Sequence, residues 1–486
     1  MKNTRFLACV SLATGAIIAL SRNSISRRVM PSGALILLVG LLAQAQAPPA
    51  IISFSRNGQL TWTDNDYASS CYTVEWSGDL GDWANSWDGL RDITTSHSSN
   101  TVSVPMFYRV VKKPKTLLSH IYVDPVLGDD THDGTEAQPR KTISAALSLL
   151  PEEIAADVTV HLKAGNYTTT GASAMPDNYL VLRRRMWPGV IVQILGDGGT
   201  TNRAVLDWSG REFLVLVLEG QWSLANLQIG TRRPGQPEGL GVEGPGLAIV
   251  RDVRIRTGTG QAAGLLARRA GRIHLYGTIE MNEDLHDAGG AATNVCMIWA
   301  KDHGTIQFMQ SVGASLSMGN GQLAASSYGS VGLGCGWAKI TSWTTGNNIA
   351  IACSGRVDLH GTETTLRGRH PDNGLIGLED DGHVLAENTH VILESLGCRD
   401  AIYLQKASMV FGGPFEVRGA FTNTVAAMSG SVFGGTVTGA VSHVEAHTGA
   451  HITLEHGSSM PRTARGWLGG TVVLPNDRVL IEEAFP

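Results

Sequence analysis

The chain has 486 residues, of which 58 are glycine and 17% are charged, and its formal net charge at pH 7 is −5. Apolar residues make up 43% of the chain, which is enough for a large folded core and excludes a disordered protein. The length predicts more than one domain.

The first 47 residues differ from the rest because they hold five basic residues and no acid. Two apolar stretches, Phe6 to Leu20 and Ala34 to Ala43, precede an Ala-x-Ala series that ends at Ala47. This order predicts a signal peptide in residues 1–47, cleaved near Ala47. We therefore expect a secreted or cell-surface protein, extracellular or periplasmic, that contacts a membrane only through an uncleaved leader. The alternative is an N-terminal anchor, although each stretch is shorter than the roughly 20 residues of a spanning helix.

Removal of this leader makes the protein acidic. Lys plus Arg falls from 38 to 33 while Asp plus Glu stays at 43, so the net charge becomes −10. Nucleic acid is not an expected partner, because phosphate contacts need a basic face. Local basic groups remain at residues 183–185, 232–233 and 268–269, either as contacts for uronate or sulfated sugars or as solvated surface.

Residues 51–112 are predicted to form a separate small β domain. Residues 59–63, 71–76, 101–104 and 107–111 alternate apolar and polar side chains, with turn residues between them. The segment resembles the fibronectin-type-III-like modules of secreted bacterial proteins, which implies a β-sandwich-like fold. Residues 113–118 are the predicted linker to a second domain at 119–486.

The second domain is predicted to begin with a short capping helix. Ile143, Ala146, Leu147 and Leu150 follow Thr142, a candidate N-cap, at helical spacing. Such a helix covers the open edge of the first strands, which otherwise invites edge-to-edge pairing. The preceding loop 124–133 is rich in Asp and is either a turn cluster or a calcium site.

The strongest signal in the chain is a motif of glycine and a β-branched residue that returns eight times between residues 271 and 452. Successive markers are separated by 33, 25, 26, 27, 26, 22 and 20 residues. This period indicates stacked units, none of which buries its own apolar face. The markers are Ile273, Ile306, Val331, Val357, Val384, Val410, Val432 and Ile452.

Each repeat reads as two or three short strands without a helix, because its apolar and polar residues alternate. That pattern favours a parallel β-helix of about 11 or 12 coils over a propeller or a leucine-rich horseshoe. The corner glycines, among them Gly271, Gly304, Gly329 and Gly430, are predicted to supply a positive φ.

The start of this domain resembles that of right-handed parallel β-helix proteins of the pectate-lyase-like superfamily. The resemblance rests on Tyr122 to Pro125, Gly128 to Thr135, Thr142 to Leu147 and Val158 to Tyr167, and it continues through the repeats. It implies an all-β fold, a right-handed parallel β-helix solenoid with a short N-terminal capping helix, preceded by the small β-sandwich-like domain. The superfamily includes lyases, hydrolases, esterases, epimerases and non-catalytic surface proteins, so the resemblance leaves function open.

Residues 379–383 are the candidate catalytic cluster. They partly resemble the paired aspartates and Gly-His element of polygalacturonases, which implies catalytic roles for Asp380, Asp381 and His383. The longer Asn-Thr-Asp-Gly motif of that family is absent, and inverting hydrolysis needs two carboxyls roughly 6.5 to 9.5 Å apart. The alternative is a polar turn.

The loop within the longest repeat is the candidate metal site. Glu283, Asp284 and Asp287 offer the oxygen ligands that Ca²⁺ prefers, and pectate-lyase relatives hold calcium against an anionic sugar. The alternative is a solvated loop, and no cofactor is required by the sequence.

Four further residues are candidates for binding substrate. Trp299 and Trp337 offer surfaces for stacking on sugars, with filling of gaps at the corners as the alternative. Arg268 and Arg269 offer contacts to an anionic sugar.

These features predict an exported β-helix protein that recognises or processes extracellular polysaccharide. As an enzyme it would be a polysaccharide lyase or a glycoside hydrolase. The alternative is a non-catalytic cell-surface or matrix protein, an adhesin-like rod.

Overall fold

The computed structural model describes residues 49–54, 59–63, 70–77, 80–81, 83, 107–114, 119–168, 180–207, 213–231, 238–257, 263–282, 296–309, 312–319, 321–343, 351–360, 363–369, 374–481 and 484–485. The predicted leader, the predicted strand at 101–104 and the acidic loop with Glu283, Asp284 and Asp287 lie outside these residues. The chain divides into the units Met1–Pro49 and Ala50–Pro486, and every described strand and helix belongs to the second. No helix in the described residues has the length and apolar character needed to cross a membrane.

The region predicted as a small β domain forms two antiparallel strand pairs. β1 (Ile51–Phe54) pairs with β2 (Leu60–Trp62), and β3 (Ser70–Ser77) pairs with β4 (Phe107–Pro114). The rings of Trp62 and Tyr72 lie 5.8 Å apart and connect the two pairs through an aromatic contact. β4 continues to Pro114, two residues into the segment predicted as the linker.

The predicted capping helix is present as α2 (Ile143–Ser148), and it contacts the strand β5 (His120–Val123). The Thr142 hydroxyl accepts a hydrogen bond from the Ala145 N–H, as an N-cap does. Three residues of the predicted apolar face are buried, namely Ile143, Ala146 and Leu147.

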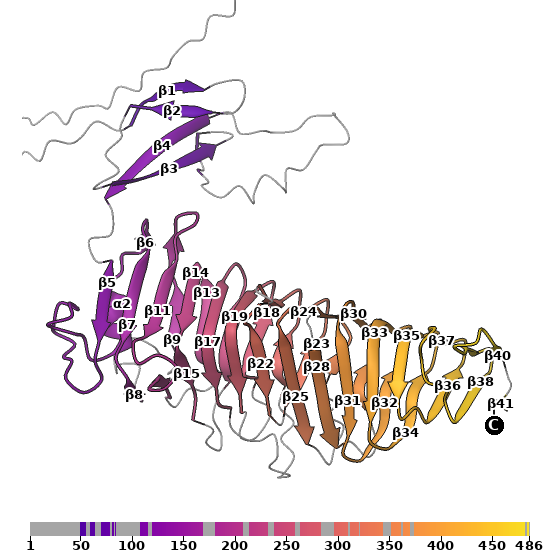
Figure 1. Ribbon diagram of the computed structural model, residues 1–486. Helices are drawn as coiled ribbons and strands as arrows, with labels where there is room; N and C mark the ends of the chain where they lie inside the picture. The colour runs from indigo at the N-terminus through magenta and orange to yellow at the C-terminus, as the bar shows by residue number, and fades with distance from the viewer. Residues whose placement is uncertain are drawn as a thin grey trace, which may run out of the picture. The chain divides into compact units, whose positions relative to one another are not determined.

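Nearly all remaining strands belong to two long sheets, between which the chain alternates (Figure 1). The 22-stranded sheet contains β5, β7 (Val158–Leu162), β8 (Gly165–Tyr167), β11 (Val192–Gly196), β12 (Ala204–Leu206), β14 (Gln221–Ala225), β15 (Leu227–Ile229), β17 (Leu247–Ile255), β19 (Arg272–Met281), β21 (Thr305–Phe308), β22 (Ser315–Met318), β24 (Ser330–Leu333), β25 (Trp337–Trp343), β27 (Arg356–Leu359), β28 (Glu363–Arg369), β30 (His383–Ala386), β31 (His390–Ser395), β33 (Met409–Arg418), β35 (Val432–Gly439), β37 (His451–Leu454), β39 (Thr471–Val473) and β40 (Val479–Ile481).

The second long sheet has 13 strands. A separate two-stranded sheet includes β10, the strand that directly follows β9 in the sequence. The pair consists of β6 (Glu153–Ile154) and β10 (Arg185–Met186). The 13-stranded sheet contains β9 (Leu180–Arg183), β13 (Phe213–Glu219), β16 (Glu238–Glu243), β18 (Leu265–Arg268), β20 (Cys296–Ala300), β23 (Gln322–Ala325), β26 (Ile351–Cys353), β29 (Gly374–Leu378), β32 (Cys398–Leu404), β34 (Phe421–Ala427), β36 (His443–His447), β38 (Thr463–Trp467) and β41 (Ala484–Phe485).

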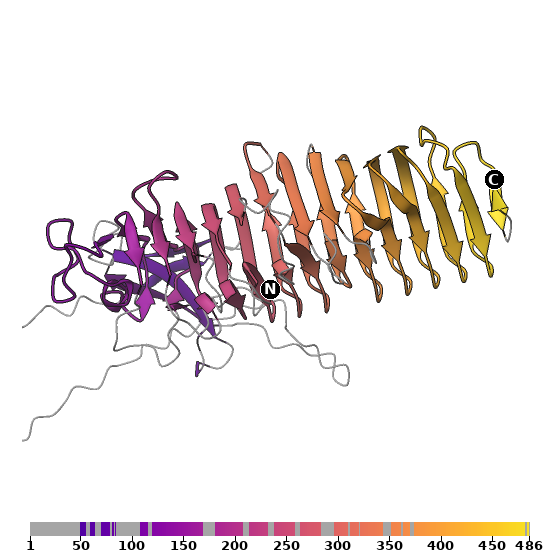
Figure 2. The same ribbon diagram turned by 90° about the horizontal axis from the view of Figure 1, so that it is seen from below.

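The chain returns to the same sheet position once per repeat, which stacks it into coils. For example, β30 and β31 are followed by β32 in the other sheet, and the next strand, β33, pairs in parallel with β30. β9 to β38 form twelve parallel layers, and β41 ends the sheet antiparallel to β38. The described strands therefore make twelve coils in an all-β, β-helix-like stack, within the predicted range, and Figure 2 shows them in chain order. We number the coils from β9 in coil 1 to β38 in coil 12.

The repeat markers share one row of the 22-stranded sheet, with one exception. Ile273, Ile306, Val331, Val357, Val384 and Val410 are successive partners in the ladder. The marker at Val432 was wrong, because fully buried Phe433 pairs with both Val410 and Ile452. Val432 and Phe433 are both apolar, so residue type alone did not show which of the two faces the core. A shift of one residue along a strand moves a side chain to the opposite face of the sheet.

The corner glycines serve a different purpose from the predicted one at most positions. Gly430 has a positive φ of 73°, as predicted, whereas at Gly304 the two preceding residues, Asp302 and His303, carry the positive φ. A Cβ at Gly304 would collide with the backbone carbonyl of Ala267 in the coil before. The same close approach applies at Gly271 and Gly329, so tight stacking of coils explains these glycines.

Candidate functional site

The turns that follow the strands of the 13-stranded sheet form a continuous row, which we call the turn edge. Each turn leads back to the 22-stranded sheet, and neighbouring turns are hydrogen-bonded to each other. The Ala270 N–H donates to the Asp302 carbonyl at 3.0 Å, and the His303 N–H donates to the Ser327 carbonyl at 3.2 Å. The coil stack therefore holds side chains from distant parts of the sequence at a spacing of about 4.8 Å per coil.

Most of the sequence candidates meet on this edge. Arg183 to Arg185 belong to coil 1, Arg268 and Arg269 to coil 4, and Asp380 and Asp381 to coil 8. Trp299 is the penultimate residue of β20, directly before the turn of coil 5. The stacked coils place these candidates in one row, but the first and last of them are seven coil steps apart.

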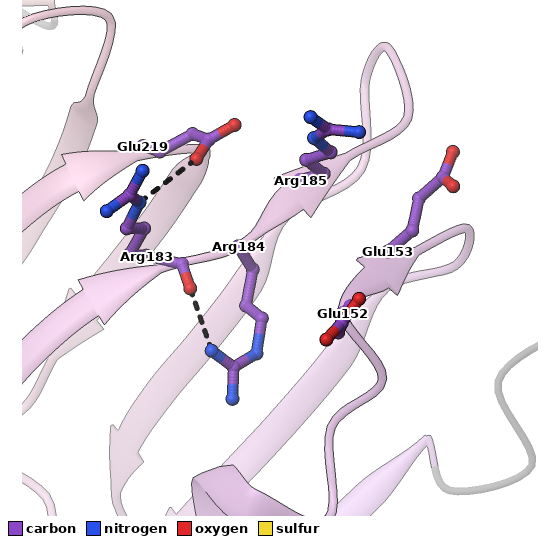
Figure 3. A pocket seen from close by; sticks show the side chains of 6 residues that line it. All are labelled: Glu152, Glu153, Arg183, Arg184, Arg185 and Glu219. Carbon is purple, nitrogen blue, oxygen red and sulfur yellow. Dashed lines mark hydrogen bonds and ion pairs between the residues drawn. The ribbon is translucent and has the colours of Figure 1, made fainter.

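The first part of the turn edge contains an open cleft of about 610 Å³ (Figure 3). Its walls come from the pair β6 and β10 and from the ends of β9 and β13. Three arginines and three glutamates line it, namely Glu152, Glu153, Arg183, Arg184, Arg185 and Glu219. The sequence had pointed to the arginines alone, because the glutamates lie about 30 residues to either side of them.

The arginines of the cleft differ in how they are held. Arg183 Nε lies 3.5 Å from Glu219 Oε2, but its side chain is 69% exposed, so this ion pair contributes little to stability. Arg184 donates through its terminal nitrogens to the carbonyl of Arg183 at 2.9 Å and to that of Leu147 at 3.2 Å. Arg185 is exposed and has no polar partner among the described residues.

The glutamates of the cleft are similarly divided. Glu153 stands beside Arg185 in the β6–β10 ladder and accepts a hydrogen bond from the Trp187 indole at 2.7 Å. Glu152 is exposed, and no polar partner for it occurs in the described part of the chain. The cleft thus offers a guanidinium for an anionic group and a carboxylate that accepts hydrogen bonds from hydroxyl groups.

Further along the edge, Glu243 binds both Arg268 and Arg269, the two arginines of coil 4 that were predicted to contact substrate. Its carboxylate accepts from Arg268 Nε at 2.5 Å and from a terminal nitrogen of Arg269 at 2.9 Å. Glu243 and Arg268 are largely buried, while the side chain of Arg269 is 69% exposed. Two guanidinium groups on one carboxylate leave a net positive charge at this position, and the role of the two arginines in binding an anionic sugar remains a prediction.

Trp299 is placed differently from the prediction of an open stacking surface. It packs at the margin of a small apolar cluster with Phe213 and Leu266, and its indole donates to the Ser326 hydroxyl at 3.0 Å. The Lys301 ammonium lies 4.0 Å from the centre of its ring. One side of the ring is therefore packed and another is covered by a cation.

A more exposed aromatic pair, which no sequence pattern indicated, lies on coils 5 and 6. The rings of His303 in coil 5 and Tyr328 in coil 6 stack with centres 5.2 Å apart and an interplanar angle of 8°. Both residues have a φ of 63°, and Tyr328 is 81% exposed. Left-handed backbone costs a residue with a side chain roughly 1–2 kcal/mol. A stacked pair contributes only about 0.5–1.5 kcal/mol, so stacking offsets part of the combined strain.

The candidate catalytic residues lie on the C-terminal part of the edge. Asp380 and Asp381 are exposed and occupy the two left-handed positions of their turn, with φ of 50° and 63°. Asp380 Oδ1 lies 3.0 Å from Lys406 Nζ, and this hydrogen bond raises the pKa of Lys406 above its usual value. His383 begins β30, between Arg356 and Met409 of the adjacent coils. Their catalytic roles remain predictions.

The other candidates do not join this row. Trp337 is 47% exposed but lies on the 22-stranded sheet, between Ser315 and Glu363. Glu283, Asp284 and Asp287 lie outside the described residues. Within the described residues, no group of three or more His, Cys, Asp or Glu side chains is arranged to hold a metal ion.

The Asp-rich loop near the N-terminus uses its carboxylates to hold its own backbone. Asp124 accepts from the N–H groups of Val126 and Leu127, both at 2.9 Å, and Asp130 accepts from that of Thr142 at 2.8 Å. Burial opposes ionisation of Asp124, but these N–H groups and Lys163 outweigh it and lower its pKa. These contacts are the ones that a turn cluster makes.

A chain of hydrogen-bonded side chains that crosses the neighbouring strands β5, β7 and β11 was also missed. Asp197 Oδ1 lies 2.8 Å from His161 Nδ1, and His161 Nε2 lies 3.0 Å from His120 Nδ1. Because an ionised carboxylate only accepts, the neutral rings carry their protons on Nδ1, which leaves His120 Nε2 as an exposed acceptor. The ring of His161 stacks on Tyr122 with centres 4.6 Å apart. His161 was visible only as one polar residue in an apolar strand.

Comparisons with known proteins do not add a family to this geometry. No known protein family matches the chain, and no curated protein or solved structure is significantly similar to it.

Proposed function

We propose that the protein is an exported β-helix protein that binds an acidic polysaccharide along coils 1 to 6 of its turn edge. The observation that carries this proposal is the cleft of coil 1, where exposed Arg185 has no polar partner among the described residues. A guanidinium binds a carboxylate or a sulfate through two parallel hydrogen bonds. The neighbouring carboxylates Glu152 and Glu153 suit the hydroxyl groups that accompany an acidic group on a sugar.

The stacked parallel sheets also support a more specific fold assignment. We infer a right-handed parallel β-helix of the pectate-lyase-like kind, preceded by a fibronectin-type-III-like module. Parallel crossovers are right-handed in nearly all proteins, which supports the handedness. The antiparallel pairs β1–β2 and β3–β4 support the module.

Binding to immobilised polygalacturonate, dextran sulfate and neutral dextran tests the proposal. We expect the protein to bind the acidic polymers and not dextran, and added salt should weaken binding because exposed charges are screened. Arg185→Ala should reduce affinity about tenfold, since a charge-assisted hydrogen bond contributes about 1.5–3 kcal/mol.

Arg418→Ala is the matched control for this experiment. Arg418 is 51% exposed, but it lies at the end of β33 on the 22-stranded sheet and pairs with Glu416. It should leave affinity unchanged. Equal binding by Arg185→Ala and the unmodified protein, or equal binding of dextran and the acidic polymers, would contradict the proposal.

A second candidate function, processing of the polysaccharide, is favoured by the hydrogen-bonded chain of Asp197, His161 and His120. An oriented Nε2 on His120 suits a general base, which takes a proton from water in a hydrolase or from a uronate carbon in a lyase. New reducing ends without unsaturated uronate identify a hydrolase, and unsaturated uronate identifies a lyase. Both products should disappear in His120→Ala and fall strongly in Asp197→Asn, whereas binding should persist. Product formation that is unchanged in both variants removes this candidate.

A further inference from the structure

The stacked pair of His303 and Tyr328 occupies positions where other coils have glycine. The second left-handed position of the turn is Gly430, Gly449 and Gly469 in coils 10 to 12. Glycine adopts this conformation without strain, whereas a bulky residue there is a genuine outlier. The chain therefore keeps a strained aromatic at a position where it uses an unstrained glycine in three other coils.

Packing does not account for Tyr328. Its side chain is 81% exposed, so the ring gains little from burial, and its contact with His303 joins two exposed side chains. Strained backbone conformations persist only where the surrounding structure enforces them, and residues held in them cluster at binding sites. A flat, exposed, rigid ring with a polar tip is the surface on which the apolar face of another ring can lie.

Three basic and two acidic side chains lie near this pair on the same edge. Lys301 and Asp302 belong to the coil of His303, and the Asp302 carbonyl accepts a hydrogen bond from the turn that carries Arg269. Arg268 and Arg269 share the single carboxylate of Glu243. A ligand that lies over Tyr328 therefore meets cations beside it, which favours an anionic ligand.

The same parallel ladder connects this pair to the cleft. β9, β13, β16, β18, β20 and β23 are successive neighbours, so the cleft of coil 1 lies four to five coils from His303 and Tyr328. At about 4.8 Å per coil the two places are roughly 20–25 Å apart. A single sugar cannot occupy both, but an extended polymer can.

We propose that His303 and Tyr328 form a second subsite, on which one sugar ring of the bound acidic polysaccharide stacks while another part of the same chain occupies the cleft. This inference rests on the proposed function and specifies its ligand as a polymer that spans coils 1 to 6. Two linked contacts bind with higher affinity than either alone, provided that the linker reaches both. Affinity must therefore rise steeply once a fragment is long enough to span about 20–25 Å.

The experiment measures the affinity of the full protein for fragments of polygalacturonate and of dextran sulfate, separated by length. For the unmodified protein we expect at least a tenfold gain between fragments shorter and longer than the span. Tyr328→Ala should lose most of this gain and retain the affinity for short fragments. Arg185→Ala should weaken the binding of short and long fragments alike.

Three further variants keep the result interpretable. Tyr328→Phe retains the ring and should retain the gain, and Tyr328→Gly should lose it while relieving the strained φ. Trp467→Ala is the matched control, because Trp467 is also exposed and stacks on a histidine, His447, but lies in coil 12.

The outcomes separate the two proposals. A full length-dependent gain in Tyr328→Ala and Tyr328→Gly, with weaker binding still seen in Arg185→Ala, overturns the second subsite alone. Absence of binding by the unmodified protein at every length overturns the proposed function and the subsite with it. Loss of the gain in Trp467→Ala as well would show that the stacking is not specific to coils 5 and 6, which also overturns the subsite.

Discussion

The two ends of the turn edge are built on the same backbone and carry different side chains. Coils 4 to 6 and coils 8 to 12 all use a turn with two successive left-handed residues. At the second of these positions coils 5 and 6 place the aromatic residues His303 and Tyr328, whereas coils 10 to 12 place glycine. Since the fold is satisfied by glycine, the side chains of the N-terminal part are not explained by folding alone. The proposed binding surface lies in the part where these side chains replace glycine.

The largest expected effect on stability concerns the close packing of neighbouring coils, which both parts of the turn edge share. Gly304→Val should destabilise the protein by about 3 kcal/mol, because its side chain meets the Ala267 carbonyl of the neighbouring coil. Gly430→Ala should cost only about 1–2 kcal/mol, since its φ of 73° is strained for alanine but no atom lies within 4 Å of the new Cβ. Urea unfolding followed by circular dichroism measures both. Equal losses would show that φ and not coil spacing determines these positions.

A second prediction separates the two arginines on Glu243. Arg268→Ala should cost about 2–3 kcal/mol, because it leaves a largely buried carboxylate with one exposed partner. Arg269→Ala should cost less than about 0.5 kcal/mol, because its side chain is 69% exposed. Thermal and urea unfolding compare the two variants with the unmodified protein. Larger destabilisation by Arg269→Ala would reverse the roles assigned to them.

Replacing the tyrosine of one turn by glycine, and the glycine of another turn by tyrosine, should change the free energy of unfolding in opposite directions. Tyr328→Gly is expected to stabilise the protein by about 1 kcal/mol, because it removes a bulky residue from a φ of 63°. Gly449→Tyr should destabilise it by a similar amount, since Gly449 has a φ of 73°. Unfolding midpoints of the two variants test the exchange. A loss of stability in Tyr328→Gly would mean that the exposed ring supports the fold.

The smallest expected effect is a local loss of stability in the loop 124–133 at low pH. Hydrogen bonds from Leu127 and Val126, together with Lys163, lower the pKa of Asp124 despite the opposing effect of burial. A lowered pKa means that the stabilisation is complete above the ordinary value of 3.8 and is lost as the pH falls through the folded-state value. Protection of the amides in the loop 124–133 from hydrogen exchange, relative to their intrinsic rates at each pH, should therefore fall below about pH 4, and Asp124→Asn should already show low protection at pH 7. Exchange in Asp124→Asn that matches the unmodified protein at pH 7 would contradict this role.

The sequence predicted the stacked parallel architecture well because each coil repeats the same local demand. A buried residue recurs at nearly constant spacing from Ile306 to Val410, and these residues are ladder partners in the structure. The prediction failed at Val432, because the adjacent residue Phe433 is also apolar and the sequence did not show which of the two is buried. It also failed at the corner glycines, because the distance to the neighbouring coil depends on residues that are remote in the sequence.

The candidate site was predicted only in part, since its members come from separate coils. Adjacent residues such as Arg183 to Arg185 were visible as a group, but the cleft also needs Glu153 and Glu219 from other strands. Similarly, Asp197 lies 36 residues from His161, so nothing in either segment indicated their hydrogen bond. Tyr328 was hidden because its exposure and its positive φ are properties of the folded turn.

Hydrogen exchange of the protein with and without a bound acidic polysaccharide tests the central claim most directly. The account predicts slower exchange on binding at residues 184–189, 269–271, 301–304 and 326–329 of the turn edge. It also predicts no change at residues 406–408, 429–431 and 448–450, where the second left-handed position holds only alanine or glycine. Protection confined to the C-terminal turns or to the 22-stranded sheet would contradict it.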